Sequence, residues 1–486
     1  MPQINYSNFP VFAAILLGGL LSGCAGLSDI APQSRVTPPE TLDAGKDIAD
    51  APRVAWPTEQ WWQVYGDPQL DALIARAVAD SPTLRAAQAR ARLAEAYARG
   101  AHASTQPEVG ADATSTRERF TGQQFIPPPW AENFSWNNEA ALSFSYDLDL
   151  WGKKADLWNA ALDDVHAAAA ETQQVRLELQ TSVARTYIRL AEAFALRDIA
   201  QSSLDQINER IAIAKRELEA GLGTQMEVSA AETALPVAQA RVEALETEIQ
   251  LQRNQLAALS GAGTGAGDDI ARPALKLDAS VGLPSELPAE LIGRRPDVRA
   301  SRWRVEAAGQ RAEAAKKAFY PNINLLAFIG FQALGFGQFI SDSAMIAGAG
   351  PAVSLPLFDA GRRRSEAEAD TAAYDVAVEN YNDTMIHALE QVSDQLVLLQ
   401  SGATQREKAR QSLASAEEAY RMAQQAHHAG LKSYRDVLDA QAVVFRQREF
   451  LAHAQAQWLD AHAGLMRALG GGANAPESGA GENPQP

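Results

Sequence analysis

Two hydrophobic patterns follow one another along this chain, and the succession occurs twice. The first pattern is helical: residues 153–220 contain neither Gly nor Pro, and apolar positions recur every three or four residues. A second tract, residues 362–429, is interrupted only by Gly402. At about 1.5 Å per residue, each tract would form a helix roughly 100 Å long. The apolar stripe of the first tract is Val165, Ala168, Thr172, Val175, Leu179, Val183, Tyr187, Leu190 and Phe194.

The second pattern is an alternation with period two, which predicts strands with one apolar and one polar face. In residues 142–150 the apolar positions are Leu142, Phe144, Tyr146, Leu148 and Leu150, and the polar ones are Ser143, Ser145, Asp147 and Asp149. Two further strands are predicted at residues 323–331 and 353–357, and a fourth at 109–120 is assigned by repeat symmetry. A soluble coiled coil explains the helical stripe but not these strands. A half-buried soluble sheet is one interpretation of the alternation, and tilted transmembrane strands are the other.

The chain is a tandem duplication. Residues 81–85 (Ser-Pro-Thr-Leu-Arg) match residues 295–299 (Arg-Pro-Asp-Val-Arg). Other landmarks keep equal spacing in the two halves, which chance does not readily produce. These paired landmarks are Pro107 and Pro321, Gly152 and Gly361, and Gly221 and Gly430. Each half therefore reads as a helix of about two dozen residues, two strands, a very long helix, a Gly turn and a second long helix.

Strand number decides between the two interpretations of the sheet. Four strands cannot close a pore, and an open sheet edge cannot face lipid. Membrane barrels need eight strands or more, and three copies of this chain would supply twelve. We therefore predict a mainly α protein with a membrane β-barrel: a trimeric α-barrel/β-barrel duct in which each protomer is a tandem duplication with four strands and long helical hairpins.

The amino-terminal region carries a candidate lipidation site. An apolar run of residues 11–21 is too short to span a bilayer, and it leads directly into Ser22, Gly23 and Cys24, the only cysteine. This arrangement resembles the lipobox of bacterial lipoproteins. An ordinary signal peptide with a chance cysteine is the alternative, and the first ten residues lack Lys and Arg. Ala25 is compatible with sorting to the outer membrane.

The predicted domain order follows from these features. It is a signal peptide (1–23), a lipidated tether (24–55), a first repeat (56–261), an equatorial linker (262–285), a second repeat (286–471) and a disordered tail (472–486). Each repeat comprises an equatorial helix, two barrel strands and a long helical hairpin.

Composition and candidate chemistry narrow the function. A formal net charge of −17 argues against nucleic-acid binding, which needs a basic surface. The seven His are scattered along the predicted helices, and the adjacent His427 and His428 cannot share a helix face. We find no catalytic constellation, no phosphate-binding loop and no metal site, and we predict no cofactor beyond the lipid on Cys24. The protein is therefore predicted not to be an enzyme.

Three local motifs, together with the duplication, resemble the outer-membrane factors of tripartite pumps, the TolC and OprM-like family, and within it the NodT-type efflux lipoproteins. The motifs are Trp61-Trp62 with Asp67-Pro68-Gln69-Leu70, Arg294-Arg295-Pro296-Asp297-Val298, and Ser354-Leu355-Pro356-Leu357-Phe358-Asp359-Ala360-Gly361-Arg362. The resemblance implies a homotrimer in the outer membrane that extends into the periplasm as the exit channel of an efflux system. It also implies a periplasmic adaptor and an inner-membrane pump, of which the resistance-nodulation-division type is expected.

The Gly turns between the long helices are candidate functional sites. The turns at Gly221, Leu222 and Thr224 and at Gly430, Leu431 and Ser433 each suit a helix end followed by a helix start. The resemblance implies that these turns form the periplasmic tip that meets the adaptor.

The family's acidic tip motif maps onto residues 434–441. Asp436 and Asp439 are three residues apart, on one helix face, and we interpret them as a periplasmic gate that Arg435 braces. The first half carries Glu227 and Ala230 instead. An Asp in the first turn of a helix is also favoured by the helix dipole, which explains Asp436 better than Asp439. Asp147 and Asp149 are predicted to line the barrel lumen.

One alternative is a lipid-anchored periplasmic adaptor or coiled-coil scaffold without a pore. Such an adaptor needs one helical hairpin between β-rich modules, whereas this chain has two hairpins of matched length and two pairs of strands. The cargo is not apparent from the sequence: drugs, metal ions and proteins all fit.

Overall fold

The computed structural model describes residues 29–43, 45, 48, 56–123, 126, 128–276 and 294–472. The predicted signal peptide, Cys24 and nearly all of the predicted tail therefore lie outside the described residues. The chain divides into two compact units. Unit 1 comprises Met1–Val36, Ala91–Ala168 and Ser301–Tyr381, and unit 2 comprises Thr37–Arg90, Ala169–Ala300 and Asn382–Pro486.

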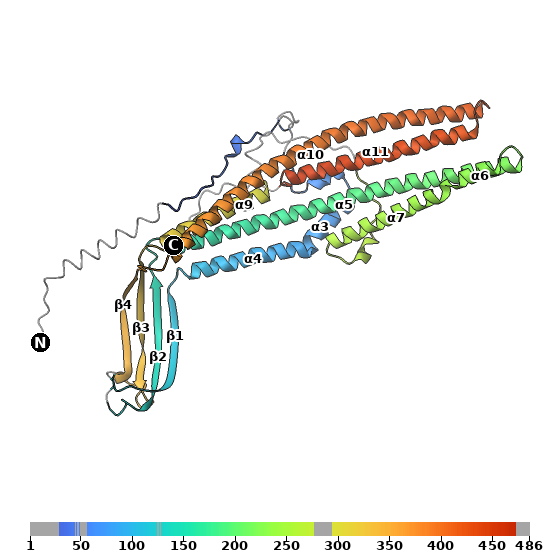
Figure 1. Ribbon diagram of the computed structural model, residues 1–486. Coiled ribbons are helices and arrows are strands. Elements are labelled where there is room, and N and C mark those ends of the chain that lie inside the picture. Colours follow the sequence, from blue (N-terminus) through green and yellow to red (C-terminus); the bar gives the residue numbers. More distant parts are fainter. Residues whose placement is uncertain are drawn as a thin grey trace. The chain divides into compact units, whose positions relative to one another are not determined.

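Unit 1 contains a four-stranded sheet with the order β1-β2-β3-β4 (Figure 1). The strands are β1 (Glu108–Arg119), β2 (Phe134–Asp147), β3 (Asn322–Leu334) and β4 (Met345–Ser354), and neighbouring strands are antiparallel. The first repeat supplies β1 and β2, and the second supplies β3 and β4. The strand at 109–120, which had only repeat symmetry to support it, is confirmed, as is the strand at 323–331.

Two predicted strand ends are wrong. The alternation suggested that β2 continues through Leu148 and Leu150, but the strand ends at Asp147. In the second half the strand was predicted at residues 353–357, whereas β4 lies at Met345–Ser354. A residue with positive φ follows each strand before the long helix begins: Asp149 at 41° comes two residues after β2, and Ala360 at 53° comes six residues after β4.

The helices match the repeat. The shorter helices α4 (Pro82–Ala103) and α9 (Pro296–Lys317) each begin with Pro, whose missing N–H costs nothing in the first turn. The long helices α5 (Lys153–Glu219) and α10 (Arg362–His428) each have 67 residues. After the Gly turns, the first hairpin returns as α6 (Gln225–Glu232) and α7 (Ala234–Leu259), and the second as α11 (Tyr434–Ala468).

The principal core lies in unit 2. It combines the short helical turn Trp61–Tyr65 and helix α3 (Pro68–Asp80) with buried faces of α5, α7, α10 and α11. The motif beginning at Asp67 has a structural explanation here: the Asp67 carboxylate accepts from Gln69 N at 3.0 Å, Tyr187 Oη at 2.7 Å and Ala274 N at 2.7 Å. One buried carboxylate thus caps α3 and fixes it to α5.

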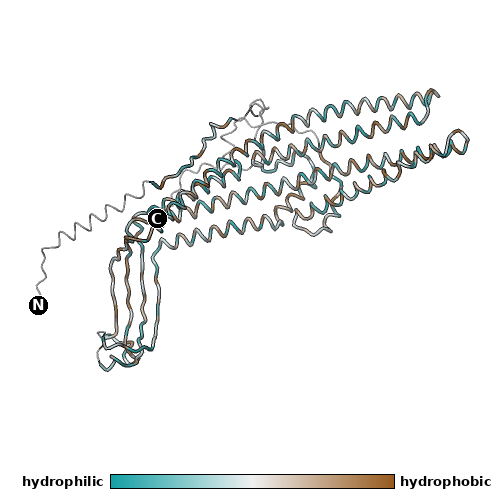
Figure 2. The backbone as a smooth tube through the Cα atoms, viewed as in Figure 1, coloured by the Kyte–Doolittle hydropathy of each residue, from teal (hydrophilic) through white to brown (hydrophobic). Residues whose placement is uncertain are grey.

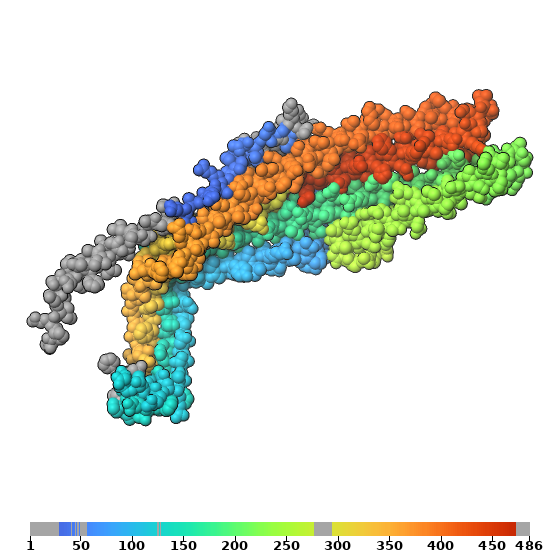
Figure 3. Space-filling view, in the orientation of Figure 1, coloured from blue at the N-terminus to red at the C-terminus, as the bar shows by residue number. Residues whose placement is uncertain are grey.

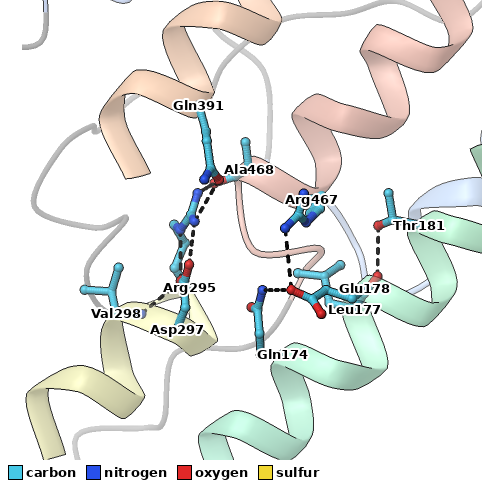
Figure 4. A network of polar contacts seen from close by, with 10 residues as sticks. All are labelled: Gln174, Leu177, Glu178, Thr181, Arg295, Asp297, Val298, Gln391, Arg467 and Ala468. Carbon is cyan, nitrogen blue, oxygen red and sulfur yellow. Dashed lines mark hydrogen bonds and ion pairs between the residues drawn. The ribbon is translucent and has the colours of Figure 1, made fainter. Parts of the chain in front are cut away.

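A second buried network explains the Arg-Pro-Asp motif of the second repeat (Figure 4). The Arg295 side chain, 5% exposed, is paired with Asp297 at 2.6 Å. It also donates to the Ala468 carbonyl at 2.9 Å and to Gln391 Oε1 at 3.0 Å. The start of α9 is thereby fixed to the end of α11 and to α10, and the motif is explained by packing.

Candidate functional site

The sheet of unit 1 has an exposed apolar face. Ala111, Leu142, Ile329 and Ala347 are paired in register across the four strands, so they share one face. Leu142 and Ile329 are each 54% exposed, and hydrophobic residues recur along the strands (Figure 2). Further apolar members of this face include Val109, Ala113, Ala140, Phe144, Tyr146, Leu325, Ala327, Phe331, Met345, Ala349 and Pro351; Ser115, Arg117 and Asn138 lie on it toward the loop end.

The opposite face of the sheet is mostly polar. It carries Asp112, Thr114, Thr116, Asn137, Glu139, Ser143, Ser145, Asn324 and Gln332. The large apolar exceptions on this face are Leu326, Phe328 and Leu334 of β3, which is apolar on both faces, and Ile346 of β4. The Phe328 ring lies over Gly348, where a Cβ would meet it at 2.7 Å. An exposed apolar face opposite a polar one is the reverse of a soluble sheet and is what a strand between lipid and water requires.

Aromatic pairs stand at both ends of this sheet. Near the helices, the Trp151 ring stacks on Tyr320 with 4.9 Å between centroids, and Trp151 Nε1 donates to the Pro321 carbonyl at 2.7 Å. At the loop end, Trp136 and Phe336 lie 5.6 Å apart. Aromatic rings at both borders of an apolar band are typical of membrane-spanning strands.

The edges of the sheet are open. Strands β1 and β4 each have a partner on one side only. Unpaired backbone groups cost several kcal/mol each in a hydrocarbon medium, so only a closed sheet can lie there. The geometry therefore requires further copies of the chain, with β4 of one copy beside β1 of the next.

The two Asp predicted in the barrel lumen differ in position. Asp147 is the last residue of β2, and its carboxylate is paired with Lys154 at 3.2 Å. The placement of Asp149 on the strand is wrong: it lies beyond β2, and its carboxylate accepts from Lys154 N at 3.0 Å and Ala155 N at 2.9 Å. The physical reason is capping, because the first N–H groups of α5 lack partners within the helix.

At the hairpin turns of unit 2, the backbone of Gly221 and of Gly430 has a φ of +72°, which favours Gly. The Thr224 and Ser433 side chains cap the helices that follow, with Glu227 and Asp436 completing reciprocal capping boxes. Leu222 is 83% exposed and Leu431 79%. Both turns lie at the same end of unit 2 (Figure 3), and each presents one large apolar side chain.

The proposed gate residues have partners on the first hairpin. Arg435 forms an ion pair with Glu217 and lies 3.7 Å from Glu227. Asp439 pairs with Arg210 at 2.6 Å. Sequence reasoning missed Glu217 and Arg210, because nothing in the local pattern signals a contact over more than 200 residues.

Asp436 and Asp439 have different hydrogen-bond and ion-pair partners at the tip. Hydrogen bonds from the Ser433 hydroxyl and backbone N–H hold the pKa of Asp436 below its ordinary value. Asp436 thus has the structural role that its place in the first turn suggested. The Asp439 carboxylate is instead paired with Arg210 of the first hairpin, so this ion pair forms only where the two hairpins meet.

Among the described residues, no group of three or more His, Cys, Asp or Glu is arranged to hold a metal ion. Within the same ranges, no helix is both long and apolar enough to cross a membrane.

Comparison with known proteins places the chain. Residues 73–262 and 287–471 match the family described as outer membrane efflux protein, one match in each repeat. The chain belongs to this family. It is 43% identical over 370 residues to the fusaric acid resistance protein FusA of Burkholderia cepacia, covering 74% of this chain and 69% of FusA. It is 30% identical over 462 residues to the multidrug resistance outer membrane protein MdtP of Escherichia coli K12, covering 93% and 94% of the two chains.

Solved structures agree with this family. VceC from Vibrio cholerae is similar with a TM-score of 0.79 and 33% identity, over 86% of this chain and 100% of that one. The CmeC outer membrane channel of Campylobacter jejuni has a TM-score of 0.82 over 92% and 96% of the two chains, and at 18% identity it supports the fold alone.

The efflux protein is therefore a protomer of a trimeric α-barrel/β-barrel duct in the outer membrane that extends into the periplasm. It is the exit channel of a tripartite efflux system, working with an adaptor and an inner-membrane pump. The alternative of an adaptor or scaffold without a pore is not supported. The family consists of transport components.

Proposed function

We propose that the resting efflux protein is closed at its periplasmic end by contacts between the two hairpin tips, and that Arg435 is the principal brace. The observation that carries the proposal is the pairing of Arg435 with Glu217 and its approach to Glu227, because these carboxylates belong to the other hairpin. Arg210 and Asp439 form a second pair of the same kind. With three copies around one axis, each ion pair occurs three times, so a small change per chain alters the whole aperture.

In the trimer, Asp436 and Asp439 would form an acidic constriction at this closed end. Asp436 is partly exposed and Asp439 is exposed, and threefold symmetry turns them into two rings of like charge. Such rings attract cations and repel one another. The paired basic residues reduce this repulsion, and separating the hairpins would release it.

The exposed tips are the docking site that we propose for the adaptor. Leu222 and Leu431, together with the capped turns at Thr224 and Ser433, offer apolar side chains on rigid supports. An apolar side chain at a fixed position is a common anchor of protein interfaces. The inner-membrane partner that we propose is a pump of the resistance-nodulation-division type.

We propose small toxic organic molecules as the cargo and a lipid on Cys24 as the additional anchor. Relatives that are named for resistance to fusaric acid and to multiple drugs support the cargo class. The sequence Leu21-Ser22-Gly23-Cys24 supports the lipid. Loss of drug resistance in a strain that lacks the gene, restored by the wild-type gene, would support this cargo. Unchanged resistance to every drug tested would contradict it.

Conductance of the purified trimer in planar bilayers tests the gate. Arg435→Ala should raise the open fraction, because two carboxylates on the first hairpin lose their cation. Arg435→Lys should retain part of the closure. Asp436→Ala combined with Asp439→Ala should lower cation selectivity and weaken block by divalent cations.

The matched control for this experiment is Arg448→Ala. Arg448 pairs with Glu417 at 3.1 Å within the second hairpin alone, so its loss should leave conductance unchanged. Equal conductance of the Arg435→Ala variant and the wild-type channel would place the gate elsewhere. Wild-type selectivity in the double Asp variant would show that the two Asp act only at the start of the helix.

A further inference from the structure

The amino-terminal segment from Asp29 to Val36 is held against helix α10. Both oxygens of the Asp375 carboxylate accept from Gln33 N, at 3.0 and 3.2 Å, and one also accepts from Ser34 N at 2.9 Å. These residues all belong to unit 1. Hydrogen bonds to an ionised acceptor are the stronger kind, so one side chain fixes two successive backbone groups of the segment.

Neighbouring features support the same attachment. Ile30 is only 6% exposed, although it belongs to a segment without regular secondary structure. Pro32 precedes the clamped residues, and its fixed φ reduces the conformational entropy that docking must overcome. Just after this segment, Thr37 N donates to Asn382 Oδ1 at 2.9 Å, within unit 2. Because Asn382 follows Asp375 along α10 as Thr37 follows Gln33 along the segment, the segment runs parallel to α10.

The parallel direction means that the chain leads back from Gln33 toward the first residue of α10, Arg362. Asp375 lies 13 residues after Arg362, a rise of about 20 Å along the helix. From Gln33 to Cys24 there are nine peptide steps, which can span at most roughly 30 Å. The exposed Phe358 precedes this end of α10, and Arg363 in its first turn lies over the ring of Phe319, the neighbour of Tyr320 in the aromatic pair with Trp151. A lipid on Cys24 can therefore reach the membrane border with only about 10 Å to spare.

We infer that Asp29–Val36 is a length-limited strap and that Asp375 is the residue that positions it against α10. This inference rests on the lipid that we propose for Cys24 and deepens it. A strap of this length ties the lipid to the protein wall beside the barrel, so that the anchor and the aromatic border meet the same membrane surface. A longer free tether would allow the lipid to insert without regard to the depth of the barrel.

Docking of the strap can be measured by trypsin. Arg35 lies within the strap, so docking should slow cleavage after it, and the purified trimer provides the substrate. Asp375→Ala should accelerate cleavage by roughly tenfold or more, as expected for lost hydrogen bonds to a charged group. Asp375→Asn, which retains one oxygen acceptor, should have a smaller effect. The control is Asp370→Ala, five residues earlier on α10, which should cleave at the wild-type rate. Equal rates for Asp375→Ala and the wild type would overturn the role of Asp375.

The length limit requires a second set of variants. Deleting Gly26 to Asp29 leaves five steps between Cys24 and Gln33, about 17 Å at most, which is shorter than the span to Arg362. The acylated short chain should therefore cleave rapidly at Arg35. Replacing the deleted residues with Gly-Ser-Gly-Ser should restore slow cleavage. The short chain with Cys24→Ser, exported by a signal peptide that is cleaved without lipidation, should also cleave slowly, because nothing pulls on its strap.

The outcomes separate the strap from the proposed lipid. Incorporation of labelled palmitate into the wild type, together with slow cleavage of the acylated short chain, would overturn the length limit while leaving the lipid in place. Absence of label in the wild type would overturn the lipid and the length limit together. In that case the Asp375→Ala rate would still decide whether the strap docks.

Discussion

The two helical hairpins arose from one repeat, but they differ most where they turn back. In the first hairpin the return is broken at Thr233 into α6 and α7, and Pro236, which lacks an N–H, follows the break. In the second hairpin α11 runs without a break from Tyr434 to Ala468. Helix α11 has 15 buried residues, whereas α7 has six. Even with the one buried residue of α6 added, the return of the first hairpin contributes less to the interior of unit 2 than the return of the second, although α5 contributes to the same core.

The difference is sharpest at equivalent positions past the two Gly turns. Leu438 of α11 is fully buried, whereas its counterpart in α6, Ser229, is exposed. The carbonyl of Leu438 also accepts a hydrogen bond from Gln206 of α5. The second tip is thus packed from within, and it also supplies the cation that pairs with the first. A movement of the second tip must break packing as well as ion pairs.

Truncating a buried side chain at the tip should give the largest difference in stability between the two hairpins. Leu438→Ala should destabilise the trimer by about 2–5 kcal/mol, because it leaves a cavity that the long helices cannot close. Ser229→Ala, at the equivalent exposed position, should change stability by less than about 0.5 kcal/mol. Thermal unfolding of the two purified variants in detergent measures both values. Similar losses in the two variants would show that the hairpins contribute equally to the interior.

Removal of the helix caps should give a smaller effect, of similar size in both hairpins. Thr224 and Ser433 each accept from the backbone of the third helical residue, so Thr224→Ala and Ser433→Ala should each cost about 1 kcal/mol. Deuterium exchange of peptides around each turn localises the loss. We expect faster exchange in the substituted hairpin only. Faster exchange in both hairpins of either variant would mean that the tips open together.

Acid should loosen both tips, and this effect should be smaller than those of core truncation and cap removal. The backbone N–H and hydroxyl of Thr224 donate to Glu227, and the hydroxyl and backbone N–H of Ser433 donate to Asp436; these bonds lower the pKa of each carboxyl group. A carboxylate whose pKa is lowered by folding contributes stability above its unfolded pKa of about 4, and this contribution is lost as the pH falls through the folded pKa. Deuterium exchange at the tips, corrected for the intrinsic pH dependence, should therefore rise below about pH 4. Exchange that stays flat at the tips would contradict the capping role.

The sequence predicted the parts of the fold that depend on local pattern. The 67-residue helices follow from tracts free of Gly and Pro, and β3 follows from its alternating residues. Strand β4 was predicted too late in the chain, at residues 353–357. Its actual sequence, Met-Ile-Ala-Gly-Ala-Gly-Pro-Ala-Val-Ser, has small residues where a recognisable alternation would need large ones. Asp149 was misplaced because an alternating polar residue and a helix cap look the same in a sequence.

The ion pairs of the tip could not be predicted in the same way. The resemblance to the family's tip motif, together with the spacing of the two Asp after the Gly430 turn, identified Arg435, Asp436 and Asp439 as candidates. Their partners, Glu217 and Arg210, lie on a helix whose surface carries many charged residues. Only the packing of the hairpins selects these two among them.

The open edges of the sheet have a consequence for assembly. A single copy exposes the unpaired backbone of β1 and β4 together with the apolar face at Leu142 and Ile329. Exposed edges and apolar surface of this kind are templates for aggregation. A lone protomer is thus unstable in water, where its apolar face is exposed, and in lipid, where its strand edges are unpaired. It is prone to aggregate until it meets two other copies. Assembly of three copies therefore competes with aggregation of the single copy. Because assembly depends steeply on protomer concentration, a chaperone that shields the protomer or a high local concentration in the membrane would favour the channel.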